Sequence, residues 1–302
     1  MVKTTRTCAL LSLLVTLSLQ AQNNKIVGLI RVRNEANTIE QHLKALACYT
    51  HALVVLNNAS GDKTVDVIRS LQNECSIEKI LHKSFWYEDD AADYNRMLFV
   101  GREIGGTHFI VLNSDELFSA NCQDNNLLKE KILSLQPGDQ LVANKIRLWM
   151  ELDRYRVDGG YSIEAVAFCD DGTAKFSDDA RLPKNLCGEK VKLLPFHRYG
   201  VLSCQNVDWT NITIKTIWKK CFERITWPSK PAQELNEKYQ RPAIDSSIRI
   251  MKAPHYWFDS YRFFDKTLYE KRNDWHESQI KQWVHQYGQN FFDGLGFALH
   301  TN

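Results

Sequence analysis

The sequence lacks an excess of charge of either sign. Its 38 Lys and Arg residues stand against 36 Asp and Glu residues, which gives a formal net charge of +2. Lys3 and Arg6 account for that difference, so the chain from residue 22 onward is neutral. A neutral chain has no bulk attraction to nucleic acid or to an anionic membrane surface. We therefore expect no nucleic-acid partner.

Closely paired cysteines are also missing. The 8 cysteines contain no C-x-x-C pair and are irregularly spaced, so the sequence predicts no zinc site. One of them, Cys8, lies in the N-terminal segment and leaves an odd number after it. Disulfides are compatible with an exported protein, but the spacing does not reveal which cysteines pair.

Long apolar runs are absent beyond the N-terminus. Ala9 to Leu19 is an apolar stretch behind Lys3 and Arg6, and Ala21 offers a small residue for cleavage. This pattern predicts that residues 1–21 are a signal peptide, which implies the secretory pathway or export. Because the site is not a clean A-x-A, a membrane anchor through residues 9–19 is the alternative. We expect membrane association only through this segment, since no later stretch is long and apolar enough to span a bilayer.

Short apolar runs alternate with helical patterns over the first half of the chain. The expected strands are Lys25–Val32, Ala52–Leu56, Ser76–Leu81 and Phe109–Leu112. Helices are expected near residues 38–47, 64–71 and 89–104. This β-α order predicts an α/β fold with a mostly parallel sheet flanked by helices on both faces. We assign residues 22–210 to this domain.

Polar residues follow these strands where each one ends. Asn113, Asp115 and Glu116 come directly after a buried strand, at the edge where open α/β sheets bind ligands. Their oxygens can hold a hard divalent cation and, through it, a diphosphate. Asn58, after the second strand, carries an amide that suits the edge of a nucleobase. For both stretches the alternative is an ordinary polar turn.

Three motifs together resemble a family 2 glycosyltransferase of the GT-A fold. They are Arg33-Asn34-Glu35, the stretch VVLNNASGDKT, and the acidic residues after GGTHFIVL. Ser60, Asp62 and Thr64 match the family's second loop, whereas Asn57 and Asn58 stand where two Asp are common. The family's D-x-D motif reads Asn113-Ser114-Asp115 here. The resemblance covers residues 25–120, the half that binds the nucleotide sugar.

The resemblance implies a role for each matching residue. Asn58 and Asp62 would recognise the base, with Arg33 and Glu35 on the first loop also in the donor site. Asp115, assisted by Asn113, would hold Mg²⁺ or Mn²⁺ beside the diphosphate of a nucleotide-diphosphate sugar. Arg96, on the helix before that strand, would reach a phosphate or else lie on a solvated face.

The second half would hold the acceptor and a carboxylate base. The family's His-Glu pair is absent, and we select Asp179, near the expected strand at Lys175-Phe176, as the general base. Residues 211–302 predict a helical, aromatic-rich extension packed on the domain. Its first helix, from Thr213 to Ile225, would place Trp218 on an apolar face with the basic residues elsewhere. The aromatic rings either cover the sheet or stack on a sugar.

The sequence thus predicts an inverting, metal-assisted glycosyltransferase that transfers a sugar from a nucleotide-diphosphate donor to a carbohydrate or glycoconjugate. The alternative is a catalytically inactive protein of the same fold that binds a carbohydrate or nucleotide. Asn in place of acids at two motif positions supports that alternative. A nucleotidyltransferase is disfavoured, because Arg31 to Asn37 contains no glycine for a phosphate-binding loop.

Overall fold

The protein was studied as a computed structural model. It describes residues 24–87, 89–157, 162–177, 183, 191–195, 198–207, 209–239, 249–269 and 274–297. Residues 1–21 and Asp179 lie outside these ranges, so the signal peptide and the general base stay predictions. Within the described ranges, no helix has both the length and the apolar character needed to cross a membrane.

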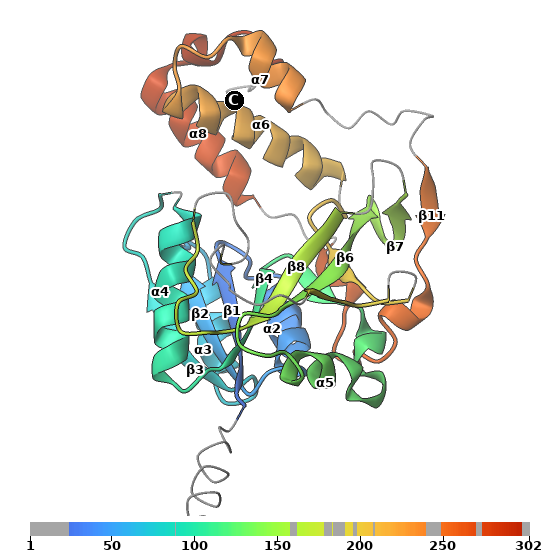
Figure 1. Ribbon diagram of the computed structural model, residues 1–302. Helices are drawn as coiled ribbons and strands as arrows, with labels where there is room; N and C mark the ends of the chain where they lie inside the picture. The colour runs from blue at the N-terminus through green and yellow to red at the C-terminus, as the bar shows by residue number, and fades with distance from the viewer. Residues whose placement is uncertain are drawn as a thin grey trace, which may run out of the picture.

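A single mixed sheet forms the centre of the molecule, with helices packed on it (Figure 1). Its strands are β1 Ile26–Val32, β2 Ala52–Asn57, β3 Ile77–His82, β4 His108–Asn113, β5 Glu116–Phe118, β6 Gln140–Trp149, β7 Glu151–Arg156, β8 Ser162–Cys169, β9 Val191–Leu193, β10 Val201–Ser203 and β11 Ile250–Lys252. The main helices are α2 Ile39–Ala47, α3 Thr64–Ser70, α4 Asp90–Glu103, α5 Leu127–Leu133, α6 Trp209–Thr226, α7 Ala232–Lys238 and α8 Trp275–Tyr287.

Strand order explains where a ligand can bind. Neighbouring strands run β11-β7-β6-β8-β4-β1-β2-β3, and the pairs among β4, β1, β2 and β3 are parallel. Beyond β4 the order continues through the antiparallel neighbours β8, β6 and β7. The carboxyl ends of β1, β2 and β4 therefore meet at one edge, which is where doubly wound sheets bind their ligands.

Both faces of β1, β2 and β4 are buried, as their continuous apolar runs predicted, whereas β3 at the end of the strand order is largely exposed. Alternate residues such as Ile30 and Val55 pack against α2, α3 and α5 on one face. Their neighbours Leu29 and Val54 pack against α4 on the other face. The predicted α/β fold class, with helices on both faces of the parallel strands, is confirmed.

One expected strand is wrong. Lys175 and Phe176 form no strand, although both are described. The side chain of Asn95 on α4 takes both backbone groups of Phe176, since its Oδ1 accepts from the Phe176 N–H and its Nδ2 donates to the Phe176 carbonyl, each at 2.9 Å. A backbone satisfied by a side chain has no need of a neighbouring strand.

The C-terminal helices form a layer of their own. Figure 1 shows α6, α7 and α8 grouped above the sheet, and α6 and α8 share a cluster around Cys221 and Ile280. Between α7 and α8 the chain returns to the sheet, where β11 pairs with β7 and Trp257 and Tyr261 enter the main core. The rings of residues 256–269 thus mostly cover the sheet, which is the first of the two alternatives for this aromatic segment.

Candidate functional site

The loop after β1 is held by the loop after β2. Three successive backbone N–H groups, those of residues 34–36, donate to the side chains of Ser60, Thr64 and Asp62 at 3.0, 2.8 and 3.2 Å. In return, Asn34 Oδ1 accepts from the Gly61 N–H at 2.8 Å. The S-x-D-x-T pattern therefore fixes the backbone around Glu35.

Asn58 is not the strained residue of its turn. The residue in the left-handed region is Ala59, with φ 54°, so Asn58 does not occupy the left-handed position of a tight turn. The Asn58 side chain is buried, and its Oδ1 has no hydrogen-bond partner within the described ranges. A buried amide oxygen without a partner is costly. Asn58 is thus available to a ligand.

The turn after β4 separates its two acids. Glu116 points into the fold, where Oε2 accepts from the Asn113 N–H at 2.9 Å and Oε1 pairs with Lys145 Nζ at 2.9 Å. Asp115 faces the other way, with its backbone fixed by the Cys204 N–H at 2.8 Å. The expectation that Glu116 would join Asp115 in holding a cation is therefore corrected.

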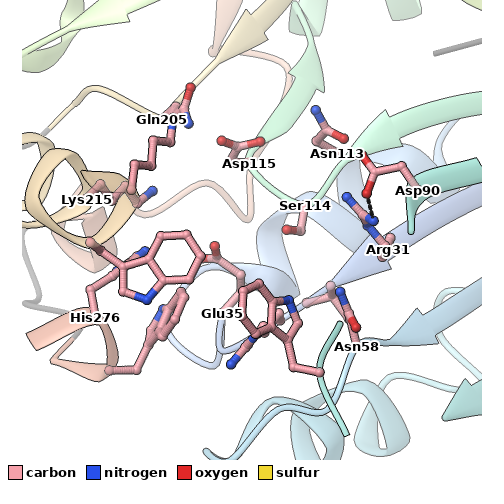
Figure 2. A pocket seen from close by; sticks show the side chains of 16 residues that line it. Arg31, Glu35, Asn58, Asp90, Asn113, Ser114, Asp115, Gln205, Lys215 and His276 are labelled. Atoms are coloured by element: carbon pink, nitrogen blue, oxygen red, sulfur yellow. Dashed lines mark hydrogen bonds and ion pairs between the residues drawn. The ribbon is translucent and has the colours of Figure 1, made fainter. Parts of the chain in front are cut away.

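A cavity of 330 Å³ lies where these three loops meet. Figure 2 shows Asn58 and Arg31 on one side, Lys215 and His276 on the other, and Asp115 between them. Its lining residues are Arg31, Val32, Arg33, Glu35, Asn58, Trp86, Asp90, Asn113, Ser114, Asp115, Gln205, Lys215, Trp218, Lys219, Trp275 and His276. The expected site residues Arg33, Glu35, Asn58, Asn113 and Asp115 are thus brought together.

Two expected site residues lie elsewhere. Asp62 does not line the cavity, because its carboxylate accepts from Ala36 and from the backbone and hydroxyl of Thr64. Arg96 does not line it either, and its Nη1 donates to the His82 carbonyl at 3.2 Å. Asp62 therefore affects the cavity only through the loop that carries Glu35.

The C-terminal helices supply a wall of the cavity that sequence reasoning missed. Lys215, Trp218 and Lys219 come from α6, so the basic residues share the Trp218 side instead of lying elsewhere. Trp86, after β3, packs on Trp218 with ring centroids 5.5 Å apart and so docks this layer on the sheet. The signal was the i, i+3, i+4 spacing of Lys215, Trp218 and Lys219, which places them on one helical face.

Arg33 is clamped between two indoles. Its guanidinium carbon lies 4.2 Å from the centroid of Trp86 and 5.0 Å from that of Trp275. Burial lowers the pKa of Arg33 to about 10, so it remains charged at neutral pH. The clamp fixes a positive charge in the wall of the cavity.

Glu35 titrates near neutrality. Burial, together with the nearby charges of Asp115 and Asp62, raises the pKa of Glu35 to about 7, while Lys215 and a hydrogen bond from Thr38 act in the opposite direction. Such a carboxyl in a cavity can hold or release a proton at physiological pH. Because ionising the Glu35 carboxyl costs free energy in the folded protein, its effect can be measured as a change of stability with pH.

We expect Glu35→Gln to change the pH dependence of stability. The pKa of Glu35 is about 7 in the folded protein and 4.5 in the unfolded chain. Its contribution to the stability of the folded state is therefore fully present below pH 4.5. That contribution is lost as the pH rises through 7, by up to about 3 kcal/mol. Urea unfolding at pH 5 and pH 8 should therefore show that the free energy of unfolding of the variant, relative to that of the wild type, is higher at pH 8 than at pH 5. Glu103→Gln, an exposed control, should follow the wild type, and equal pH profiles for wild type and Glu35→Gln would refute the assignment.

The cavity offers few side chains that could coordinate a metal ion, but their oxygen atoms suit a divalent cation. Among the described residues there is no group of three His, Cys, Asp or Glu side chains that could hold a metal ion. Asp115, Ser114 and Asn113 offer oxygen atoms to the cavity, and Asn113 Oδ1 also accepts from the Tyr94 hydroxyl at 3.3 Å. Mg²⁺ is commonly bound by one or two carboxylates with phosphates and waters completing its shell. Asp115 therefore fits a cation shared with a diphosphate.

Comparison with known proteins gives distant structural neighbours. No family model matches the sequence, and neither does any curated protein. TarS residues 1–349 from S. aureus has a TM-score of 0.41 at 11% identity, over 90% of this chain and 83% of that one. Mannosyltransferase PcManGT from Pyrobaculum calidifontis, in complex with GDP-Man and Mn²⁺, has a TM-score of 0.44 at 13% identity, over 87% and 74%. A putative glucose-1-phosphate thymidylyltransferase from Bacillus anthracis has a TM-score of 0.28 at 11% identity, over 82% and 100%. At these values the resemblance decides nothing about activity.

Proposed function

We propose that the protein is a glycosyltransferase of the family 2 type, which transfers a sugar from a nucleotide-diphosphate donor to a carbohydrate or glycoconjugate acceptor. The observation that supports this best is the convergence of the loops after β1, β2 and β4 on one cavity. That cavity combines the Asn58 amide, whose oxygen has no partner among the described residues, with the Asp115 carboxylate; these groups suit the base and the diphosphate of one donor.

In this proposal each wall of the cavity has one task. Asn58 binds the base, Arg33 and Glu35 complete the donor site, and Asp115 with Asn113 holds Mg²⁺ or Mn²⁺. A cation held there would stabilise the negative charge that grows on the diphosphate as it leaves. The acceptor oxygen forms a bond to the anomeric carbon from the opposite face as the bond to the diphosphate breaks. Asp179 takes the acceptor proton, which gives inversion.

A donor screen on the full chain tests the proposal. We expect UDP or GDP, present at about a hundred times its Kd, to raise the thermal midpoint by about 5 °C or more. The matching nucleotide sugar should also lose its sugar slowly to water, detected as released nucleoside diphosphate. If no nucleoside diphosphate raised the midpoint and no donor were consumed, the proposal would be wrong.

The same experiment separates the inactive alternative. Asn113 in place of the first Asp of the family motif removes one negative ligand, which is the feature that favours a binding protein without turnover. A nucleotide that stabilises the protein while every donor and acceptor combination stays intact would support that alternative.

A further inference from the structure

The wall built by α6 concentrates positive charge at one side of the cavity. Lys215 and Lys219 line it from α6, and Arg33 lines it from the end of β1. All three act on His276, whose pKa is lowered to about 2 by burial and by these charges. His276 is therefore neutral at physiological pH, so the positive charge of the wall comes from Lys215, Lys219 and Arg33.

Arg33 is held in place by ring contacts, while two of its hydrogen-bond donors have no acceptor among the described residues. The indoles of Trp86 and Trp275 fix its plane. Its Nε and Nη1 are buried and have no hydrogen-bond partner within the part of the chain that the structure describes. Buried donors without acceptors are rare in folded proteins. A guanidinium already fixed in its binding orientation also loses little freedom when it binds a planar or tetrahedral anion.

Two of the acidic groups that line the cavity are paired elsewhere or carry only part of a charge. Asp90 pairs with Arg31, and Glu35 is partly protonated near neutral pH. The third acidic residue, Asp115, lies between the Asn58 side and the Lys215 side of the cavity (Figure 2). A ligand that starts at Asn58 and carries two phosphates would place them between Asp115 and the cationic wall.

We propose that Lys215, Lys219 and Arg33 bind the diphosphate of the donor directly, through charge-assisted hydrogen bonds. This inference rests on the proposed function and adds the residues that grip the leaving group. The fixed cations then supply most of the nucleotide affinity, and Asp115 with its cation acts mainly on the rate. The C-terminal helices are part of the donor site and not only a cover for the sheet.

Titration calorimetry on the full chain tests this directly, with UDP, GDP and inorganic pyrophosphate as ligands. We expect the double variant Lys215→Ala, Lys219→Ala to bind the preferred nucleotide at least about tenfold more weakly. Removal of divalent cations from the wild type with EDTA should weaken nucleotide binding less than the replacement of the two lysines does. Lys281→Ala on α8, an exposed lysine outside the cavity, should bind like the wild type.

The outcomes separate this inference from the proposed function. If the wild type binds a nucleoside diphosphate and the double alanine variant binds it equally well, the cationic wall is not the diphosphate site, and the proposed function stands. Binding that disappears in EDTA while the lysine variants lose nothing would likewise overturn the inference alone. If neither nucleotide nor pyrophosphate binds the wild type, both proposals fail. The charge-conserving variant Lys215→Arg, Lys219→Arg should retain binding, which provides a test should the alanine variants unfold.

Discussion

Replacing Asp115 by asparagine should lower kcat for sugar transfer by about a hundredfold or more. The substitution keeps the shape of the side chain and removes its charge, so the cavity loses the one carboxylate of the Asn113-Ser114-Asp115 segment. Removal of one group that stabilises developing transition-state charge typically costs a factor of this size. The measurement is kcat at saturating donor and acceptor, with Mn²⁺ titrated at each point.

The effect should fall on the rate more than on donor binding. If fixed cations hold the diphosphate, the Kd for the nucleotide in Asp115→Asn should change by less than about tenfold. Asp66→Asn, an exposed carboxylate in the first turn of α3, is the matched control and should retain wild-type kcat. A kcat for Asp115→Asn within a factor of two of the wild type would show that Asp115 takes no part in the chemistry and would overturn its proposed role as metal ligand.

The position of the site could be predicted from the sequence because it depends on two strong signals. Short apolar runs predict buried parallel strands, and polar residues directly after them mark the edge where the loops meet. Asn58 and Asp115 are far apart in the chain, yet both line the same cavity. Only strand order was needed to bring them together.

The direction of individual side chains could not be predicted in this way. Asp62 belongs to the same polar loop as Asn58, but its carboxylate accepts from the Ala36 N–H of the neighbouring loop and from the Thr64 N–H of its own. Asp115 and Glu116 are adjacent and acidic, yet they point to opposite sides of the turn. A motif records which residues are present and leaves open which of them contact ligand and which support the backbone. That distinction depends on hydrogen bonds between loops.

The contribution of the C-terminal helices was missed for a different reason. Trp86, more than a hundred residues earlier in the chain, packs against Trp218 and Phe222 of α6 and so helps to hold this helix at the cavity. No local pattern in α6 reports that contact. A helix with apolar and basic residues on neighbouring faces fits equally well a solvated surface and an anion site.

Glu116→Ala should be the most destabilising substitution near the site, with a loss of about 3 kcal/mol in the free energy of unfolding. Glu116 is only 1% exposed and pairs with Lys145, while its second oxygen accepts from the Asn113 N–H. Alanine would leave that N–H without its acceptor and the lysine with Glu164, at 3.2 Å, as its remaining acidic partner. Urea unfolding at neutral pH measures the loss.

Two further variants distinguish support of the turn from metal binding. Glu164→Ala removes the more exposed partner of Lys145 and should cost about 1 kcal/mol or less. Glu116→Gln keeps an acceptor for the Asn113 N–H and should recover part of the lost stability. A metal ligand would behave in the opposite way, since its removal would weaken Mn²⁺ binding and leave the fold intact. A loss below about 1 kcal/mol in Glu116→Ala, with weakened Mn²⁺ binding, would therefore reverse the roles assigned to Asp115 and Glu116.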